Sequence, residues 1–140
     1  MTHETQATPV TQGVHHVGLT VPELQETTSF FVDVLGYKQI GEVPDYPAVF
    51  LSDNQVMITL WQATNPEQAT PFDRTNVIGL HHLALTVRDE VALKELHQRL
   101  ARVDGVAIEF APEPLGDGPT QHMMCSIPGG IRTEFITPAA

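Results

Sequence analysis

The sequence has one cysteine and few basic residues, and both shortages exclude functions. Because Cys125 stands alone, the chain can form no intrachain disulfide and no cysteine-based zinc site. Only seven residues are Lys or Arg, against 17 Asp and Glu, and the formal net charge is −10. Binding to nucleic acid needs clustered basic side chains. Small molecules are therefore the expected partners, and nucleic acid is not.

Long apolar runs are also missing. No segment approaches the roughly 18 apolar residues of a membrane span, and residues 1–12 lack the basic and apolar parts of a secretory signal. We expect a cytoplasmic protein that does not associate with membranes, with residues 1–12 as a flexible tail. The 140 residues suffice for a substantial core but not for two unrelated domains with separate cores.

What the sequence does contain is an internal repeat. Residues 13–21 read GVHHVGLTV and residues 79–87 read GLHHLALTV, with six of nine positions identical. In both copies the apolar spacing that follows is typical of a one-faced helix. The first predicted helix starts after Pro22 and ends at Gly36. The second starts at the N-cap Asp89 and ends near Gly105.

Short apolar runs follow each helix and predict strands. They cover residues 48–51 and 55–61 in the first copy, and 121–126 and 131–137 in the second. The predicted fold class is α+β, with two tandem βαβββ modules whose uncovered faces pack together in one chain or across a dimer. Module one covers about residues 13–62, the connector 63–78 and module two 79–138, all within a single domain, 13–140.

Strand parity distinguishes the two histidines of each pair. Alternate side chains of a strand face opposite sides, so His15 and His81 should lie on the helix side. His16 and His82 should lie on the other face, beside small residues that leave room for a ligand. Because the strands are related by the repeat, His16 and His82 can meet at one site.

Glu134 is a charged residue within the last apolar strand, where a carboxylate needs a partner. The plain alternative is a salt-bridged or edge glutamate. Two imidazoles and one carboxylate, however, are a common ligand set for a divalent metal. We therefore predict that His16, His82 and Glu134 bind one metal ion.

These motifs resemble the vicinal oxygen chelate superfamily, which includes glyoxalase I, extradiol dioxygenases and bleomycin-resistance proteins. The resemblance covers about residues 13–138 and rests on the paired His-hydrophobic-x-Leu-x-Val strands and on the hairpin from Pro128 to Glu134. It implies curved mixed sheets that form a cup around one divalent metal ion, and a homodimer. The implied function is a metal-dependent, glyoxalase-like or dioxygenase-like enzyme whose small oxygen-bearing organic substrate is chelated to the metal. Histidine and glutamate accept Fe, Mn, Zn, Ni or Co, so the metal is left open.

Two positions depart from the family pattern. Aligning residues 55–61 with 130–136 puts Thr59 opposite Glu134, where glyoxalase I and the family's epimerase have a further glutamate that can act as base. Met124 stands where the extradiol dioxygenases have a tyrosine. The reaction therefore stays open between that of a dioxygenase and that of a lyase or isomerase. The alternative function is metal-free sequestration of a small molecule, as in bleomycin resistance.

The remaining site predictions follow from parity. His122 shares the parity of Met124 and should face the cup, where an imidazole can take or give a proton near neutral pH. We predict a catalytic role for His122. The alternative is that His122 is structural or merely exposed. The predicted substrate-binding residues are Met57, Thr59, Trp61 and Met124.

Overall fold

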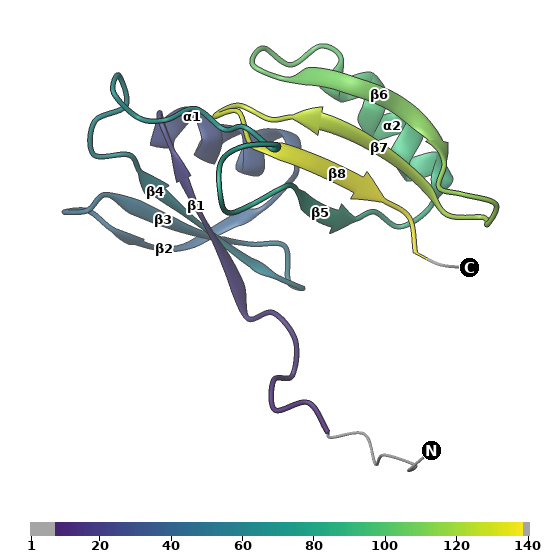
Figure 1. Ribbon diagram of the computed structural model, residues 1–140, viewed down its shortest axis with the longest axis horizontal. Helices are drawn as coiled ribbons and strands as arrows, with labels where there is room; N and C mark the ends of the chain where they lie inside the picture. The colour runs from purple at the N-terminus through teal and green to yellow at the C-terminus, as the bar shows by residue number, and fades with distance from the viewer. Residues whose placement is uncertain (1–7, 139–140) are drawn as a thin grey trace.

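Two four-stranded sheets form the fold of the computed structural model, which describes residues 8–138 (Figure 1). The first module contains β1 (His16–Val21), α1 (Leu24–Ser29), a π-helical turn η1 (Phe30–Val34), β2 (Lys38–Val43), β3 (Ala48–Ser52) and β4 (Met57–Gln62). The second contains β5 (Leu83–Thr86), α2 (Glu90–Leu100), β6 (Ala107–Pro114), β7 (Gln121–Ser126) and β8 (Arg132–Ile136). The strand orders are β1-β4-β3-β2 and β5-β8-β7-β6. The predicted α+β fold with two βαβββ modules is confirmed.

Both sheets are mixed in the same way. The first strand of each module runs parallel to the last, and the remaining neighbours are antiparallel. β1 and β5 therefore each lie at an edge of a separate sheet. Between β4 and β5 no helix or strand is formed, in line with the expected connector. Of the predicted tail, residues 1–7 lie outside the described residues, and residues 8–12 are exposed without regular structure.

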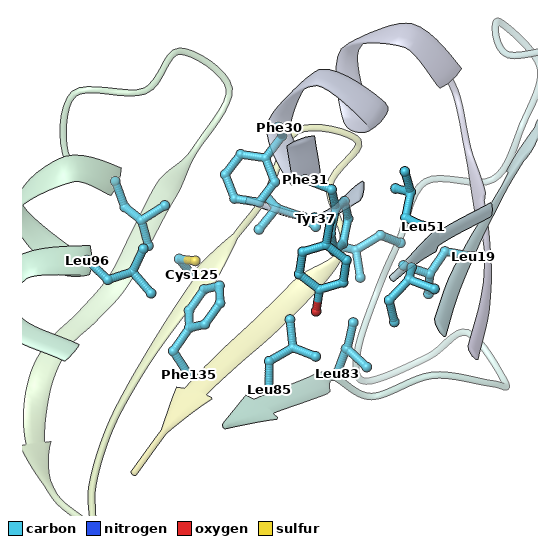
Figure 2. Close-up of a cluster of buried hydrophobic side chains, with 14 of the residues drawn as sticks. Leu19, Phe30, Phe31, Tyr37, Leu51, Leu83, Leu85, Leu96, Cys125 and Phe135 are labelled. Atoms are coloured by element: carbon cyan, nitrogen blue, oxygen red, sulfur yellow. The ribbon is translucent and has the colours of Figure 1, made fainter. Parts of the chain in front are cut away.

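The helix-facing sides of the two sheets share one core (Figure 2). Leu19 on β1 and Leu85 on β5 belong to the same cluster of buried side chains, with Phe30, Phe31 and Tyr37 of the first module alongside. Within the strands the predicted alternation is confirmed, because Leu19, Val21, Leu83 and Leu85 are buried and their even-numbered neighbours are exposed. The expectation that His15 and His81 face the helix side is wrong, since both precede their strands and are exposed, and His81 approaches Arg132 instead. The faces that carry His16 and His82 thus point away from the core.

The first helix differs from the prediction of one continuous helix. It is α-helical only to Ser29 and then widens into the π-helical turn η1. Two consecutive residues of this turn, Phe30 and Phe31, are both buried. Its N-terminus is capped from β4, since the Gln62 side chain accepts a hydrogen bond from the Leu24 N–H at 2.8 Å. This cap comes from a residue 38 positions away, so no local signal predicts it.

The second helix follows the sequence closely. Asp89 is the predicted N-cap, and its Oδ1 accepts a hydrogen bond from the Ala92 N–H at 2.9 Å. This bond lowers the pKa of Asp89, because it stabilises the charged carboxylate. Leu93, Leu96 and Leu100 face the core. The helix ends at Leu100, five residues before Gly105, because the chain turns away through residues 101–105.

The hairpin between β7 and β8 is anchored on the first module. The buried Thr27 hydroxyl of α1 donates a hydrogen bond to the carbonyl oxygen of Pro128 at 2.9 Å. Gly129 has φ of +104°, and a Cβ there would come within 2.9 Å of Thr27 Oγ1. Because β8 leaves directly from this hairpin, the contact fixes one end of the strand that carries Glu134.

Two further features concern the whole chain. The single cysteine, Cys125, is buried on β7, and burial raises the pKa of its thiol to about 12.

Within residues 8–138, no helix combines the length and the apolar character needed to cross a membrane.

The glycines of the hairpin between β7 and β8 test whether the hydrogen bond from Thr27 to Pro128 anchors this hairpin. We expect Gly129→Ala to lower the free energy of unfolding by about 1–3 kcal/mol more than Gly130→Ala. Both residues have positive φ, but only at Gly129 would the added methyl displace the Thr27 hydroxyl from Pro128, while Gly130 has open space around it. Urea unfolding of the two variants measures the difference, and equal losses would contradict the anchor.

Candidate active site around Glu134

Glu134 lies in the middle of β8 and is only 8% exposed. It pairs with Ala84 of β5 on one side and Met124 of β7 on the other. A buried carboxylate is costly without compensating partners. In this structure the partners are two imidazoles, His82 and His122.

Each oxygen of the Glu134 carboxylate faces one of these histidines. Oε1 lies 3.2 Å from Nε2 of His82, and Oε2 lies 2.6 Å from Nδ1 of His122. His122 is largely buried and packs against the ring of Phe110 at a centroid distance of 4.9 Å. Because a carboxylate accepts hydrogen bonds and does not donate them, the hydrogen of this contact is assigned to Nδ1 of His122.

The structure brings together two of the three predicted metal ligands. His82 and Glu134 are in contact, whereas His16 lies in the other sheet, is exposed, and contacts His15. Across residues 8–138, no group of three or more His, Cys, Asp or Glu side chains is arranged to hold a metal ion. The predicted triad therefore does not converge within one copy of the chain.

Sequence reasoning placed His122 on the correct face but did not predict its contact with Glu134. A signal was present in the strand pairing. Met124 lies opposite Glu134, and His122 is two residues from Met124 on the same face, which puts it diagonally next to Glu134. Such diagonal neighbours can be assigned only once the register of β7 and β8 is known.

Thr59 occupies in the first module the place that Glu134 holds in the second. β1 pairs Gly18 with Thr59, as β5 pairs Ala84 with Glu134. Thr59 is buried, and its hydroxyl accepts a hydrogen bond from the indole N–H of Trp61 at 2.8 Å. The two modules thus share their backbone register, but the first has a neutral hydroxyl where the second has a carboxylate.

The other predicted substrate-binding residues lie on two different sheets. Met57 and Trp61 are half-buried on β4, and Met124 is buried on β7. Trp61 contacts the rings of Tyr46 at 4.6 Å and of Phe50 at 6.0 Å, so this face of the first sheet is aromatic. Whether these side chains bind substrate stays a prediction.

Two cavities lie elsewhere, between the modules. Their volumes are about 270 and 310 Å³, and they share Asp53 of the turn between β3 and β4, and Leu85 and Thr86 of β5. Neither is lined by Glu134, His122 or Trp61. The predicted site residues therefore lie on the two sheets outside these cavities.

A second polar network borders the site. Arg132, two residues before Glu134 on the same face of β8, donates to both carboxylate oxygens of Glu109 at 2.8 and 2.7 Å. The hydrogen bonds from Arg132 lower the pKa of Glu109 and raise that of Arg132. Arg74 of the connector adds a third contact to Glu109 at 3.2 Å. Arg132 also approaches His81 Nδ1, at 3.4 Å.

The donor set around Glu134 suits a divalent transition metal. An imidazole nitrogen and a carboxylate oxygen lie next to each other at His82 and Glu134, and both are ordinary ligands of Zn, Mn, Fe, Co and Ni. The hydrogen bond from His122 to the second oxygen is the kind of contact that orients a ligating carboxylate. These residues fit such an ion, although two protein ligands are fewer than a catalytic metal usually has.

Comparisons with known proteins agree on the fold. A family model described as Glyoxalase/Bleomycin resistance protein/Dioxygenase superfamily matches residues 13–135. A 2-epi-5-epi-valiolone epimerase from Actinomyces sp. is 29% identical over 150 aligned positions, which cover 91% of this chain and 80% of that protein.

Solved structures show the same arrangement. A glyoxylase/bleomycin resistance protein/dioxygenase domain from Frankia sp. EAN1pec aligns with a TM-score of 0.76 at 25% identity, covering 91% of this chain and 92% of that one. A mutant of the fosfomycin resistance protein FosX from Listeria monocytogenes, complexed with Mn(II) and 1S,2S-dihydroxypropylphosphonic acid, aligns with a TM-score of 0.73 at 18% identity. Here 93% of this chain and 95% of that chain are covered.

The pairing of Arg132 with Glu109 predicts a pH dependence of stability. The pKa of Glu109 is lower in the folded state than in the unfolded chain, so the pair stabilises the fold above the unfolded pKa, about 4.3. This contribution is lost as the pH falls through the folded pKa. Solvent screens the pair, because the Glu109 side chain is 39% exposed, so the effect is modest.

We therefore expect Glu109→Gln to lower the melting temperature at neutral pH, and expect the difference from the wild type to shrink as the pH is lowered to about 3. Glu67→Gln, on the exposed connector, is the matched control and should change little at either pH. Thermal unfolding across this pH range measures both variants. A Glu109→Gln difference that stays constant with pH would contradict the ion pair.

Proposed function

Since this chain belongs to the Glyoxalase/Bleomycin resistance protein/Dioxygenase superfamily, we propose that it is a divalent-metal-dependent enzyme that moves a proton next to a carbonyl group of a small oxygen-bearing substrate. The observation that carries this proposal is the buried Glu134 carboxylate with one imidazole at each oxygen. We assign His82 to share a metal ion with Glu134, and His122 to act as a base.

In the proposed site His82 and Glu134 hold the metal ion, and the third ligand is His16 of a second copy. Two observations support a contribution from a second copy. First, His16 and Glu134 lie on separate sheets of one chain. Second, β1, which carries His16, and β5, which directly follows His82, each have an unpaired edge. Exposed strand edges favour pairing with another chain. In a symmetric dimer, β1 of one copy would pair with β5 of the other. This pairing would bring His16 next to His82 at two equivalent sites.

The metal ion supplies one part of the chemistry, because a divalent cation bound to a carbonyl oxygen acidifies the neighbouring C–H. The chain supplies the base. His122 directs its Nδ1–H to Glu134, which leaves Nε2 to remove the proton and to return it. Its contact with Phe110 holds the ring in this orientation. Because Thr59 has no basic group, we assign to His122 the role of base that a second glutamate would otherwise have.

The relative at 29% identity supports proton transfer over oxygen chemistry. That protein is named as an epimerase, and epimerisation next to a carbonyl requires removal of a proton from one face of the carbon and delivery of a proton to the opposite face. The aromatic side chains around Trp61, which would face the ion across the dimer, suit a substrate with an apolar or cyclic face.

Metal binding and its dependence on two copies can be tested together. We expect the wild type to bind one divalent ion per chain after reconstitution, and expect His82→Ala and His16→Ala each to lose it, because each removes one of three ligands. His97→Ala, which changes a histidine of α2 outside the site, is the control and should bind as the wild type does. Elemental analysis of the purified proteins gives the stoichiometry.

Co-expression of the two metal-free variants then tests the dimer. If His16 and His82 of one site come from different copies, mixed dimers contain one intact site, and about one site in four should bind metal in a random mixture. A mixture that stays metal-free would contradict the shared site. A wild type that binds no divalent ion would overturn the enzyme proposal in favour of metal-free sequestration.

The role of His122 needs a variant that keeps Glu134 oriented. His122→Asn retains an N–H donor near the position of Nδ1 but has no second ring nitrogen to act as base. We expect it to bind metal as the wild type does and to lose about 10²- to 10⁴-fold in rate. The rate is measured as deuterium uptake from D₂O into a panel of cyclic and open-chain α-hydroxyketones, followed by proton NMR. Uptake at the wild-type rate in His122→Asn would rule out His122 as the base.

A further inference from the structure

One row of paired residues crosses the first sheet from β1 to β2. Its members, on β1, β4, β3 and β2 in turn, are Gly18, Thr59, Phe50 and Gly41. Side chains that are paired in this way project from the same face of a sheet, and so does the side chain two positions along a strand. The ring of Phe50 and that of Trp61 therefore share one face, with a glycine at each end of the row.

The two glycines leave room for these rings. A Cβ at Gly18 would lie 3.3 Å from Nε1 of Trp61 and 3.1 Å from Oγ1 of Thr59. A Cβ at Gly41 would lie 3.2 Å from Cδ2 of Phe50. Neither glycine has a positive φ, so the backbone conformation does not require glycine at these positions. The close approach of the aromatic side chains does.

A directed bond also holds the indole of Trp61. Its N–H donates to the hydroxyl oxygen of Thr59 at 2.8 Å, and the direction is certain because an indole nitrogen only donates. The Thr59 hydroxyl is itself buried, and its oxygen lies 3.5 Å from the carbonyl oxygen of Val17. Tyr46 meets the indole edge to face, at a centroid distance of 4.6 Å and an angle of 81°. The indole is thus held both at its N–H and at its ring.

The second module has no such arrangement. The corresponding row consists of Ala84, Glu134, Met124 and Phe110. The counterpart of Trp61 is Ile136, since β1 pairs Thr20 with Trp61 as β5 pairs Thr86 with Ile136. Alanine thus stands where no indole approaches, and Gly18 stands where one does. The exchange of Gly18 for Ala84 is one of the three differences between the two nine-residue repeats, so the cleared space belongs to the module with the aromatic rings.

We propose that Trp61 and Phe50 form a platform that binds the apolar face of a ring-shaped hydroxyketone, and that Thr59 positions this platform. A saturated ring presents several C–H groups on one face, and the negative face of an aromatic ring attracts them. An open chain reaches the same surface only by giving up conformational freedom. Trp61 and Phe50 are half-buried, so the platform is accessible. This inference rests on the proposed function and narrows its substrate class to cyclic α-hydroxyketones.

Three substitutions separate the position of the indole from the stability of the sheet. Thr59→Val keeps the shape of the side chain but removes the acceptor for the indole N–H, whereas Thr59→Ser keeps the hydroxyl. Gly18→Ala introduces the residue of the second module and displaces the indole by a different route. Thr64→Val, at an exposed position of the connector, is the matched control.

The first measurement compares a ring with an open chain. Each protein is reconstituted with Zn²⁺, and in parallel with Mn²⁺. Deuterium uptake from D₂O is then followed for 2-hydroxycyclohexanone and for 4-hydroxyhexan-3-one, which has the same number of carbon atoms. We expect Thr59→Val and Gly18→Ala to lower the preference for the ring, as the ratio of the two kcat/KM values, about three- to tenfold. The change should appear in KM for the ring rather than in kcat. Thr59→Ser and Thr64→Val should retain the wild-type ratio.

The second measurement does not depend on turnover. Trp61 is the single tryptophan of the chain, so its fluorescence reports on the platform alone. In the reconstituted wild type, 2-hydroxycyclohexanone should quench this fluorescence saturably and at lower concentration than 4-hydroxyhexan-3-one. Thr59→Val should lose this difference, and Thr59→Ser should keep it. Without either ketone, acrylamide should quench Trp61 more strongly in Thr59→Val, because the indole has lost its bond.

The outcomes distinguish this inference from the proposed function. If the wild type exchanges the ketones but Thr59→Val keeps the wild-type preference for the ring, the platform is overturned and the proposed function is not. If the wild type exchanges neither ketone with either metal, yet binds the ring more tightly in a way that depends on Thr59, the proposed function fails and the platform is supported. Quenching of Trp61 that is absent from the wild type, or equal for both ketones, would mean that these aromatic side chains only pack against one another.

Discussion

The carboxylate of Glu134 is the constraint on which the arrangement of the second module depends. A nearly buried negative group must be compensated, and here one oxygen faces His82, just before β5, and the other faces His122 on β7. His82 enters from the edge-strand side and His122 from the opposite side. The register of β5, β8 and β7 therefore cannot slip by one residue without moving Glu134 or both histidines to the wrong face of the sheet.

This register is supported from outside the module. Thr27 of α1 donates to the carbonyl oxygen of Pro128, and Gly129 fits against it with no room for a side chain. The first module thus holds the hairpin from which β8 begins, through a contact between residues 101 positions apart. The shared core adds non-directional packing to this one directed bond. The position of Glu134 consequently depends on both halves of the chain.

Much of this could be predicted because the repeat supplies the same pattern twice. Alternation in residues 13–21 and 79–87 assigned the faces of β1 and β5, and Asp89 marked the start of α2 by its local capping chemistry. Strand β7 has the predicted bounds, residues 121–126. Each of these features depends on neighbours within a few positions, which a sequence displays directly.

What could not be predicted depends on contacts between distant segments. The cap on α1 comes from Gln62, and the π-helical turn η1 interrupts the continuous helix that the spacing predicts. The contact of His122 with Glu134 needed the register of two strands. The separation of His16 from Glu134 needed the placement of one sheet relative to the other, which periodicity within a module does not contain.

The differences between the repeats explain why one module is insufficient for the proposed chemistry. Both modules have the histidine pair, but only the second has a carboxylate in the opposite strand, where the first has Thr59. Arg132 has Met57 as its counterpart, so the cation beside the histidine pair is also unique to the second module. Two modules of the second kind would place two carboxylates and two guanidinium groups around one ion, and the additional charges would each need compensation. In the proposed arrangement of one module of each kind, the first would contribute the imidazole of His16 and an aromatic wall, and the second the carboxylate of Glu134 and the proposed base, His122. Such a division of roles requires the two kinds of module to face each other, which the unpaired edges of β1 and β5 permit between copies of the chain.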